Sequence, residues 1–172
     1  MSVDTTRTIV LLRHAKADWS DTSDHERPLA ERGRTDAPVA GRKLADSGIT
    51  FDLAVCSTAA RTRETWKLAV HELPERPRTV YEDRVYEASL GELIALLNET
   101  PDTVGSLILI GHNPGMHALA DALAGEAEGD HLARMSRSGF PTGSYATLTF
   151  TGSWKSLEHG VGTLTGFWTP HD

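Results

Sequence analysis

The chain has few cysteines, no long apolar run and fewer basic than acidic residues. Its 172 residues include one cysteine, Cys56, which excludes an internal disulfide and any metal cluster built on several cysteines. The longest apolar runs, IVLL and SLILI, are too short to cross a bilayer. Lysine and arginine number 17 against 24 acidic residues, a formal net charge of −7 at pH 7. Nucleic acid and anionic membranes call for basic patches, so we expect neither as a partner.

Several other signals are missing. Residues 1–7, MSVDTTR, lack the apolar stretch of a signal peptide, so we expect a cytoplasmic protein. Neither a Walker-type nor a dinucleotide-binding glycine loop is present, and we expect no cofactor. The length fits one domain over residues 1–172 with a core large enough to be stable alone. We also expect a monomer.

Strand and helix patterns alternate along the chain, which is typical of βαβ units. Continuous apolar runs predict buried parallel strands over residues 8–12, 53–57 and 106–110. A short edge strand is expected over 79–81, and the alternating YATLTF and GTLTGFW runs predict two closing antiparallel strands. We therefore expect an α/β fold, with one three-layer domain, a mostly parallel central sheet and helices on both faces.

Helical spacing predicts four helices, over residues 29–46, 60–73, 89–99 and 113–123. Pro38 lies inside the first of them. If Thr35 is the N-cap, Pro38 falls in the first turn, where its missing amide proton costs nothing. Ser89 and Glu92 have capping-box spacing. The polar stretch 125–143 predicts no element.

Each buried strand ends beside a side chain that can bind phosphate. The first runs into Arg13 and His14, Arg61 follows the second, and the third leads into His112. Open α/β sheets bind ligands at the carboxyl ends of their strands, so we expect these four side chains at one edge. A neutral imidazole can attack phosphorus, and guanidinium groups bind its oxygens through forked hydrogen bonds. The set is typical of phosphoryl transfer without a metal ion.

Each candidate also has a purely structural explanation. His14 could be a core histidine, Arg61 a solvated arginine at a helix start, and His112 a helix cap. The pairing of Arg13 with His14 at an apolar strand end favours a site, because arginine is seldom buried without a partner. Glu87 precedes a predicted helix, where it either complements the positive helix end or serves as a general acid.

Metal and cysteine chemistry fit the sequence less well. His112 and His117 are five residues apart and would lie on different faces of a helix, unlike the paired ligands of HExxH. Cys56 and Arg61 enclose four residues without glycine, where cysteine phosphatases have five, so Cys56 is predicted to be a small buried hydrophobe. Surface positions are expected for the remaining candidates, namely Arg63, His25, His71, His131, His159 and His171.

Four segments together resemble the histidine phosphatase superfamily, also called phosphoglycerate-mutase-like: LLRHAKADW, RPLAERG, CSTAARTRET and IGHNPGM. The small SixA-type phosphohistidine phosphatases are the branch that the chain resembles most. The resemblance runs from Val10 to the final strand. It implies a phosphoglycerate-mutase-like fold and a nucleophile, His14, that becomes phosphorylated, with the phosphoryl oxygens held by Arg13, Arg61 and His112.

The resemblance implies a metal-independent phosphatase that hydrolyses phosphohistidine carried on a protein. The family's usual RHG reads RHA here, which is acceptable if Ala15 needs no positive φ. In larger relatives an acid after the third strand protonates the leaving oxygen, and Glu87 falls near that position. Little sequence between Arg61 and Ser106 is left to build a lid, so we expect an open site.

Two alternatives stay open: a phosphomonoesterase acting on a small phosphate substrate, and a non-catalytic module that binds phosphoproteins. A mutase fits less well, because mutases usually carry a longer insert that encloses the phosphoglycerate.

Overall fold

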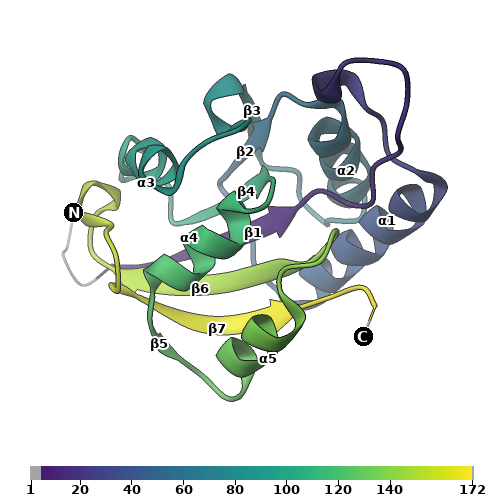
Figure 1. Ribbon diagram of the computed structural model, residues 1–172. Helices are drawn as coiled ribbons and strands as arrows, with labels where there is room; N and C mark the ends of the chain where they lie inside the picture. The colour runs from purple at the N-terminus through teal and green to yellow at the C-terminus, as the bar shows by residue number, and fades with distance from the viewer. Residues whose placement is uncertain (1–4, 172) are drawn as a thin grey trace.

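The computed structural model describes residues 5–171, in which seven strands form one sheet (Figure 1). The strand order is β3-β2-β4-β1-β6-β7-β5. The strands are β1 (Thr6–Arg13), β2 (Leu53–Ser57), β3 (Arg78–Glu82), β4 (Ser106–Gly111), β5 (Ala124–Ala127), β6 (Tyr145–Thr151) and β7 (Gly162–Trp168). Neighbours among β3, β2, β4 and β1 pair in parallel, as do β5 and β7, while β6 is antiparallel to β1 and β7. The predicted mostly parallel sheet, its edge strand and its two closing antiparallel strands are confirmed.

Helices cover both faces of the sheet, as predicted. They are α1 (Glu31–Asp46), α2 (Ala60–Val70), α3 (Leu90–Asn98), α4 (Gly115–Leu123) and α5 (His131–Ser138), with short 3-10 turns at Asp24–Glu26, Asp83–Val85 and Trp154–Ser156. Side chains of β1 alternate between two cores: Ile9 and Leu11 pack with α3, α4 and α5, while Val10 and Leu12 pack with α1 and α2. This alternation follows from the two-residue period of a strand.

The prediction that Thr35 caps the first helix is wrong. The N-cap is Ala30, five residues before Thr35, and helix α1 begins at Glu31 with Pro38 inside it. The Thr35 hydroxyl donates back to the Glu31 carbonyl within the helix instead of capping it. Contacts to the preceding loop fix the early start: the Ala30 amide donates to the Lys16 carbonyl, and a Cβ on Gly33 would stand 2.1 Å from the same oxygen. Tertiary contacts therefore outweigh the cost of an internal proline.

The stretch 125–143, for which no element was predicted, holds most of β5 and all of α5. Strand β5 is a short, largely exposed edge strand, and α5 buries a single residue, Met135, so neither has the apolar pattern that marks the other elements. Along the described chain, no helix is long and apolar enough to cross a membrane.

Candidate active site

The three predicted strand ends meet at one edge of the sheet. Strands β2, β4 and β1 are consecutive and parallel, so the residues that follow them emerge side by side. The amide of His14 donates to the carbonyl of Gly111 at 3.0 Å, which ties the end of β1 to the end of β4. The rings of His14 and His112 consequently lie 5.4 Å apart between centroids.

His14 is held as a neutral imidazole with one nitrogen available. It is only 7% exposed, and its Nδ1 lies 2.7 Å from the carbonyl oxygen of Ala15. A carbonyl only accepts, so Nδ1 carries the proton and Nε2 keeps its lone pair. Burial lowers the pKa of His14 to about 3, with smaller contributions from the nearby His112, Arg13 and Arg61. A neutral ring of this tautomer can act as a nucleophile through Nε2.

The two arginines are partly satisfied and partly unpaired. Arg13 donates from one terminal nitrogen to the Phe140 carbonyl at 2.9 Å, and burial followed by the charge of Arg61 lowers its pKa. Arg61 donates to the backbone carbonyl of Asp24 at 2.8 Å and to the carboxylate of Asp24 at 3.1 Å. The Nε of each arginine is buried without a partner. Both guanidiniums therefore keep hydrogen-bonding capacity for an anion.

His112 presents its other nitrogen to the same site. The Ser57 hydroxyl lies 2.7 Å from His112 Nε2 and also accepts from the Ala59 amide, so its proton is available for Nε2. With Nε2 as acceptor, Nδ1 carries the proton, and Nδ1 is buried without a partner. Burial first, and then the charge of Arg61, lower the pKa of His112 to about 4.

Unpaired buried groups are rare in folded proteins and call for an explanation. Within residues 5–171, four buried side-chain nitrogen or oxygen atoms have no partner, and three belong to Arg13, Arg61 and His112. These three are N–H groups at the same strand ends. An anion with several oxygen acceptors, such as a phosphoryl group, would satisfy them together.

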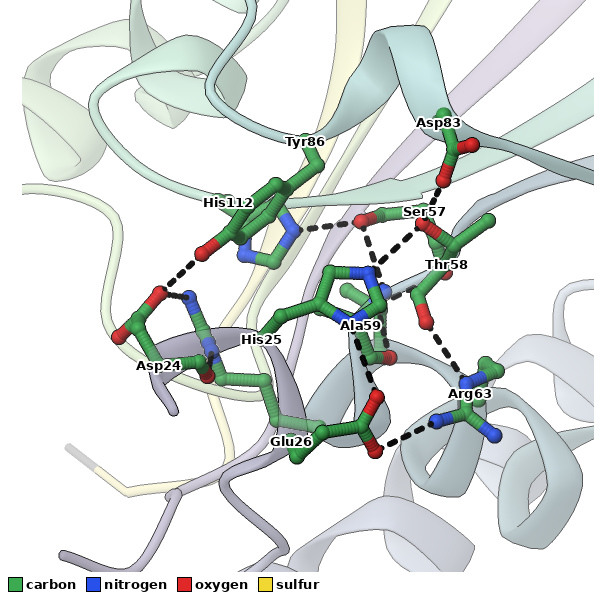
Figure 2. Close-up of polar contacts among 12 residues, drawn as sticks. Asp24, His25, Glu26, Ser57, Thr58, Ala59, Arg63, Asp83, Tyr86 and His112 are labelled. Atoms are coloured by element: carbon green, nitrogen blue, oxygen red, sulfur yellow. Dashed lines mark hydrogen bonds and ion pairs between the residues drawn. The ribbon is translucent and has the colours of Figure 1, made fainter. Parts of the chain in front are cut away.

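Two loops close over part of the site from opposite sides (Figure 2). Tyr86, after β3, donates its hydroxyl to Asp24 at 2.5 Å, and Asp24 follows β1. The Tyr86 ring also packs edge-on against His112, with 5.6 Å between centroids. The adjacent cavity of about 430 Å³ is lined by Asp24, Arg61, Tyr86, Glu87 and His112, among other residues. The hydrogen bond between Asp24 and Tyr86, which the sequence did not predict, forms part of the rim of the site.

Glu87 lines this cavity and is not the cap of helix α3. Helix α3 is capped by Ser89 and Glu92, whose side chains and backbone amides form the predicted capping box. Among the described non-glycine residues, Glu87 alone has a positive φ, of 58°. Such backbone strain concentrates at functional sites. Ala15 has no positive φ, so alanine in place of the usual glycine is sterically acceptable there.

Some expectations for individual residues need correction. His25, expected at the surface, is half-buried beside the site, where its Nε2 lies 2.9 Å from the Thr58 hydroxyl and its ring packs edge-on against Tyr86 (Figure 2). Gly111, at the end of β4, makes room for Met116, whose side chain would stand 2.8 Å from an added Cβ. No sequence motif marked His25 or Tyr86 as site residues.

The expectations for Cys56 and Arg63 are confirmed. Cys56 is fully buried, and burial raises the pKa of its thiol, which makes it a poor nucleophile. Arg63 is a surface residue that donates to the Thr58 carbonyl. Between residues 5 and 171, no group of three or more histidine, cysteine or acidic side chains is arranged to hold a metal ion.

Comparisons with known proteins agree with this geometry. The profile of the "Histidine phosphatase superfamily (branch 1)" matches residues 9–137. An uncharacterized protein of Mycobacterium tuberculosis strain H37Rv is 37% identical over 161 residues, which cover 92% of this chain and 99% of the relative.

Two solved structures, both described as "putative phosphohistidine phosphatase SixA", share the fold over nearly the whole chain. The one from Nakamurella multipartitia is 30% identical, with a TM-score of 0.81, over 97% of this chain and 98% of that chain. The one from Agrobacterium tumefaciens is 33% identical, with a TM-score of 0.80, over 95% of this chain and 98% of that chain. The phosphoglycerate-mutase-like fold and the similarity to the SixA-type branch are thus confirmed, and this chain belongs to the histidine phosphatase superfamily.

Proposed function

We propose that this protein is a metal-independent phosphatase that hydrolyses phosphohistidine on proteins through a phosphorylated His14. The observation that carries the proposal is the state of His14, a buried neutral imidazole whose Nδ1 is tied to the Ala15 carbonyl and whose Nε2 keeps its lone pair. Unpaired N–H groups of Arg13, Arg61 and His112 lie at the same strand ends. The two similar solved structures described as "putative phosphohistidine phosphatase SixA" support the choice of substrate.

In the first step, His14 Nε2 attacks the phosphorus atom, and the bond from phosphorus to the substrate imidazole breaks. Arg13, Arg61 and His112 donate hydrogen bonds to the three phosphoryl oxygens, which carry the spread charge of the transition state. Glu87, which lines the cavity, gives a proton to the departing nitrogen. The products of this step are an unphosphorylated histidine side chain on the substrate protein and a phosphorylated His14 on the enzyme.

In the second step, water attacks the phosphorus atom on His14. Glu87, now a carboxylate, takes a proton from that water while the bond from phosphorus to His14 breaks. Inorganic phosphate leaves and His14 returns to its neutral form. The same cationic groups stabilise both transition states, so neither step requires a metal ion.

The proposal is tested by trapping the intermediate. Enzyme mixed with radiolabelled phosphohistidine protein and quenched in alkali should carry an acid-labile phosphate on His14, and His14→Ala should carry none and lack activity. Chelators should leave the rate unchanged. Label on Cys56, or full activity in the His14→Ala variant, would contradict the assignment.

One observation favours the alternative of a small-molecule phosphomonoesterase. Glu87 has a positive φ and lines the cavity beside Arg61 and His112, and an alkyl phosphate needs a proton donor more than phosphohistidine does. Comparing kcat/KM for a phosphohistidine protein with that for a panel of small phosphate esters distinguishes a phosphohistidine phosphatase from a small-molecule phosphomonoesterase.

A further inference from the structure

Trp19 is exposed beside the site in a way that packing does not explain. Its side chain is 81% exposed, more than any other large apolar side chain of the described residues. It belongs to the loop of residues 16–28, which follows β1 and stands next to α2 in dark purple (Figure 1). An isolated surface hydrophobe is ordinary by itself. Trp19 differs in two respects. Neighbouring residues of the loop hold its side chain in place, and those residues also contact Arg61 of the phosphate site through a chain of interactions.

The loop fixes both the ring and the backbone of Trp19. The guanidinium of Arg27 lies over the indole at 4.2 Å from its centroid, a cation–π contact. The Trp19 amide donates to the Asp18 carboxylate at 3.0 Å, and the Asp18 amide donates to the Pro28 carbonyl at 2.8 Å. An aromatic side chain ordered before binding loses little conformational entropy when a partner covers it.

The arginine that packs on Trp19 is connected to the phosphate site through Asp24. Arg27 Nε donates to one carboxylate oxygen of Asp24 at 3.1 Å, and the other oxygen accepts from Arg61 at 3.1 Å. Three contacts therefore join the exposed indole to an arginine proposed to bind phosphate. Asp24 lines the cavity and Trp19 does not, so a small substrate inside the cavity would leave Trp19 uncovered.

Charge indicates what kind of partner would cover this surface. The exposed acidic side chains of the loop are Asp18, Asp21, Asp24 and Glu26, against a single exposed basic side chain, Lys16. Asp24 is paired with the mostly buried Arg27 and with Arg61, and Glu26 is paired with Arg63. Asp18 and Asp21, which flank Trp19 in the chain, form no ion pair with another described residue, so they carry the negative charge that a partner would meet. A partner that places an apolar side chain on Trp19 should therefore carry basic residues beside it.

We propose that Trp19 and the loop of residues 16–28 form a docking surface for the polypeptide that carries the phosphohistidine. An apolar side chain of that polypeptide covers the indole, and neighbouring lysine or arginine side chains face the loop carboxylates. This inference rests on the proposed function and adds to it the recognition of sequence around the phosphorylated histidine.

The test uses three substrates with the same reacting group: free phosphohistidine, a phosphohistidine peptide flanked by leucine and lysine, and one flanked by serine and glutamate. The wild-type protein should prefer the leucine and lysine peptide. Trp19→Ala should lower kcat/KM for that peptide about 10-fold, mainly through KM, because exposed tryptophans that become buried dominate binding energy. Its kcat/KM for free phosphohistidine should stay unchanged.

Two further variants distinguish docking on Trp19 from the loss of any exposed aromatic side chain and test the charge of the loop. Tyr81→Ala removes another exposed aromatic side chain, 51% exposed on the edge strand β3, and should behave as the wild type. Asp21→Asn removes one exposed negative charge of the loop. It should reduce the ratio of kcat/KM between the peptide flanked by leucine and lysine and the peptide flanked by serine and glutamate. An equal loss for all three substrates in Trp19→Ala, or a wild-type protein indifferent to the flanks, would overturn the docking surface while the proposed function stands. A protein that hydrolyses alkyl phosphates but none of the three substrates would overturn both.

Discussion

At the scale of single residues, a serine hydroxyl decides which nitrogen of His112 faces the phosphate site. Ser57 is fully buried at the end of β2, and its hydroxyl lies 2.7 Å from His112 Nε2. Without that partner either nitrogen of a neutral imidazole could carry the proton, and the ring could rotate. Ser57 therefore acts through His112, as a residue that positions a phosphate donor.

We predict that Ser57→Ala lowers kcat/KM about 10-fold, the scale of one lost hydrogen bond, for phosphohistidine and alkyl phosphate alike. Ser144→Ala is a matched control, because it removes a buried hydroxyl that has no partner. It should keep wild-type kinetics. Equal losses in the two variants would mean that the activity responds to packing near the site rather than to the orientation of His112.

The second residue prediction concerns Glu87. Imidazole can depart from phosphohistidine with little help, so Glu87→Gln should slow that reaction only modestly. An alkyl phosphate, whose leaving oxygen needs a proton, should lose about 10²–10⁴-fold in rate. Arg61→Ala should instead damage both reactions, because both transition states share its stabilisation of oxygen charge. Steady-state rates on the two substrates test this, and a harmless Glu87→Gln would remove the general acid from the mechanism.

The residues that sequence could and could not predict differ in a physical way. His14, Arg61 and His112 follow strands whose apolar runs place them at one sheet edge. Asp24 and Tyr86 come from two irregular segments, and their hydrogen bond exists only once both loops have packed. A buried strand leaves an apolar pattern in the sequence, whereas a contact between two loops leaves no sequence pattern.

At the scale of elements, α1 and α2 approach so closely at Gly41 that no side chain fits at that position. A Cβ on Gly41 of α1 would stand 2.2 Å from the carbonyl oxygen of Ala69 in α2. Helix α2 carries Arg61, and the Thr65 hydroxyl of α2 accepts from the Ala15 amide, next to His14. The packing of these two helices therefore helps to set the separation of the nucleophile and the arginine.

We predict that Gly41→Ala lowers the free energy of unfolding by about 1–3 kcal/mol, because the added methyl group forces the helix backbones apart. Gly91→Ala provides the matched control, since Gly91 lies in α3 and nothing stands within 4 Å of an added Cβ. It should raise the free energy of unfolding by about 0.5–1 kcal/mol through helix propensity. Urea denaturation of both variants measures the difference, and similar effects of the same sign would contradict the packing argument.

Element prediction succeeded where burial imposed a pattern. Strand β4 is buried from Leu107 to Gly111 and reads as a continuous apolar run. Helix α5 and strand β5 have almost no buried apolar side chains, so no period marks them. The N-cap of α1 was placed at Thr35 instead of Ala30, because backbone contacts between Gly33 and the Lys16 loop, which no local signal records, overrule the cap that Thr35 could provide.

At the scale of the whole molecule, an acidic protein concentrates positive charge at one sheet edge. The chain has a formal net charge of −7, yet Arg13 and Arg61 lie close enough for the charge of Arg61 to lower the pKa of Arg13. Near them His14 and His112 are kept neutral by burial, with pKa values lowered to about 3 and about 4. Keeping the buried imidazole of His14 and the half-buried imidazole of His112 neutral links the stability of the fold to pH.

The sign of this linkage follows from the two states of the chain. An unfolded histidine binds a proton near pH 6.5, while His14 in the folded protein does so only near pH 3. Between these values the unfolded state binds more protons, so acid favours unfolding. Stability from His14 is fully present above pH 6.5, and about 2 kcal/mol of it is lost by pH 5. The stability from His112, whose pKa in the folded protein is about 4, falls by a similar amount by pH 5.

We therefore predict that the free energy of unfolding falls between pH 7 and pH 5, and that part of the fall disappears when His14 is replaced. His14→Gln keeps a polar side chain of similar size but cannot bind a proton in this range, so its loss should be smaller by about 2 kcal/mol. Urea denaturation of both proteins at the two pH values measures the difference directly. Carboxylates with lowered pKa values, such as Asp24, protonate below this window and act equally in both proteins. Identical losses in the two proteins would show that His14 takes up its proton as easily folded as unfolded, which would remove the buried neutral nucleophile from the proposed mechanism.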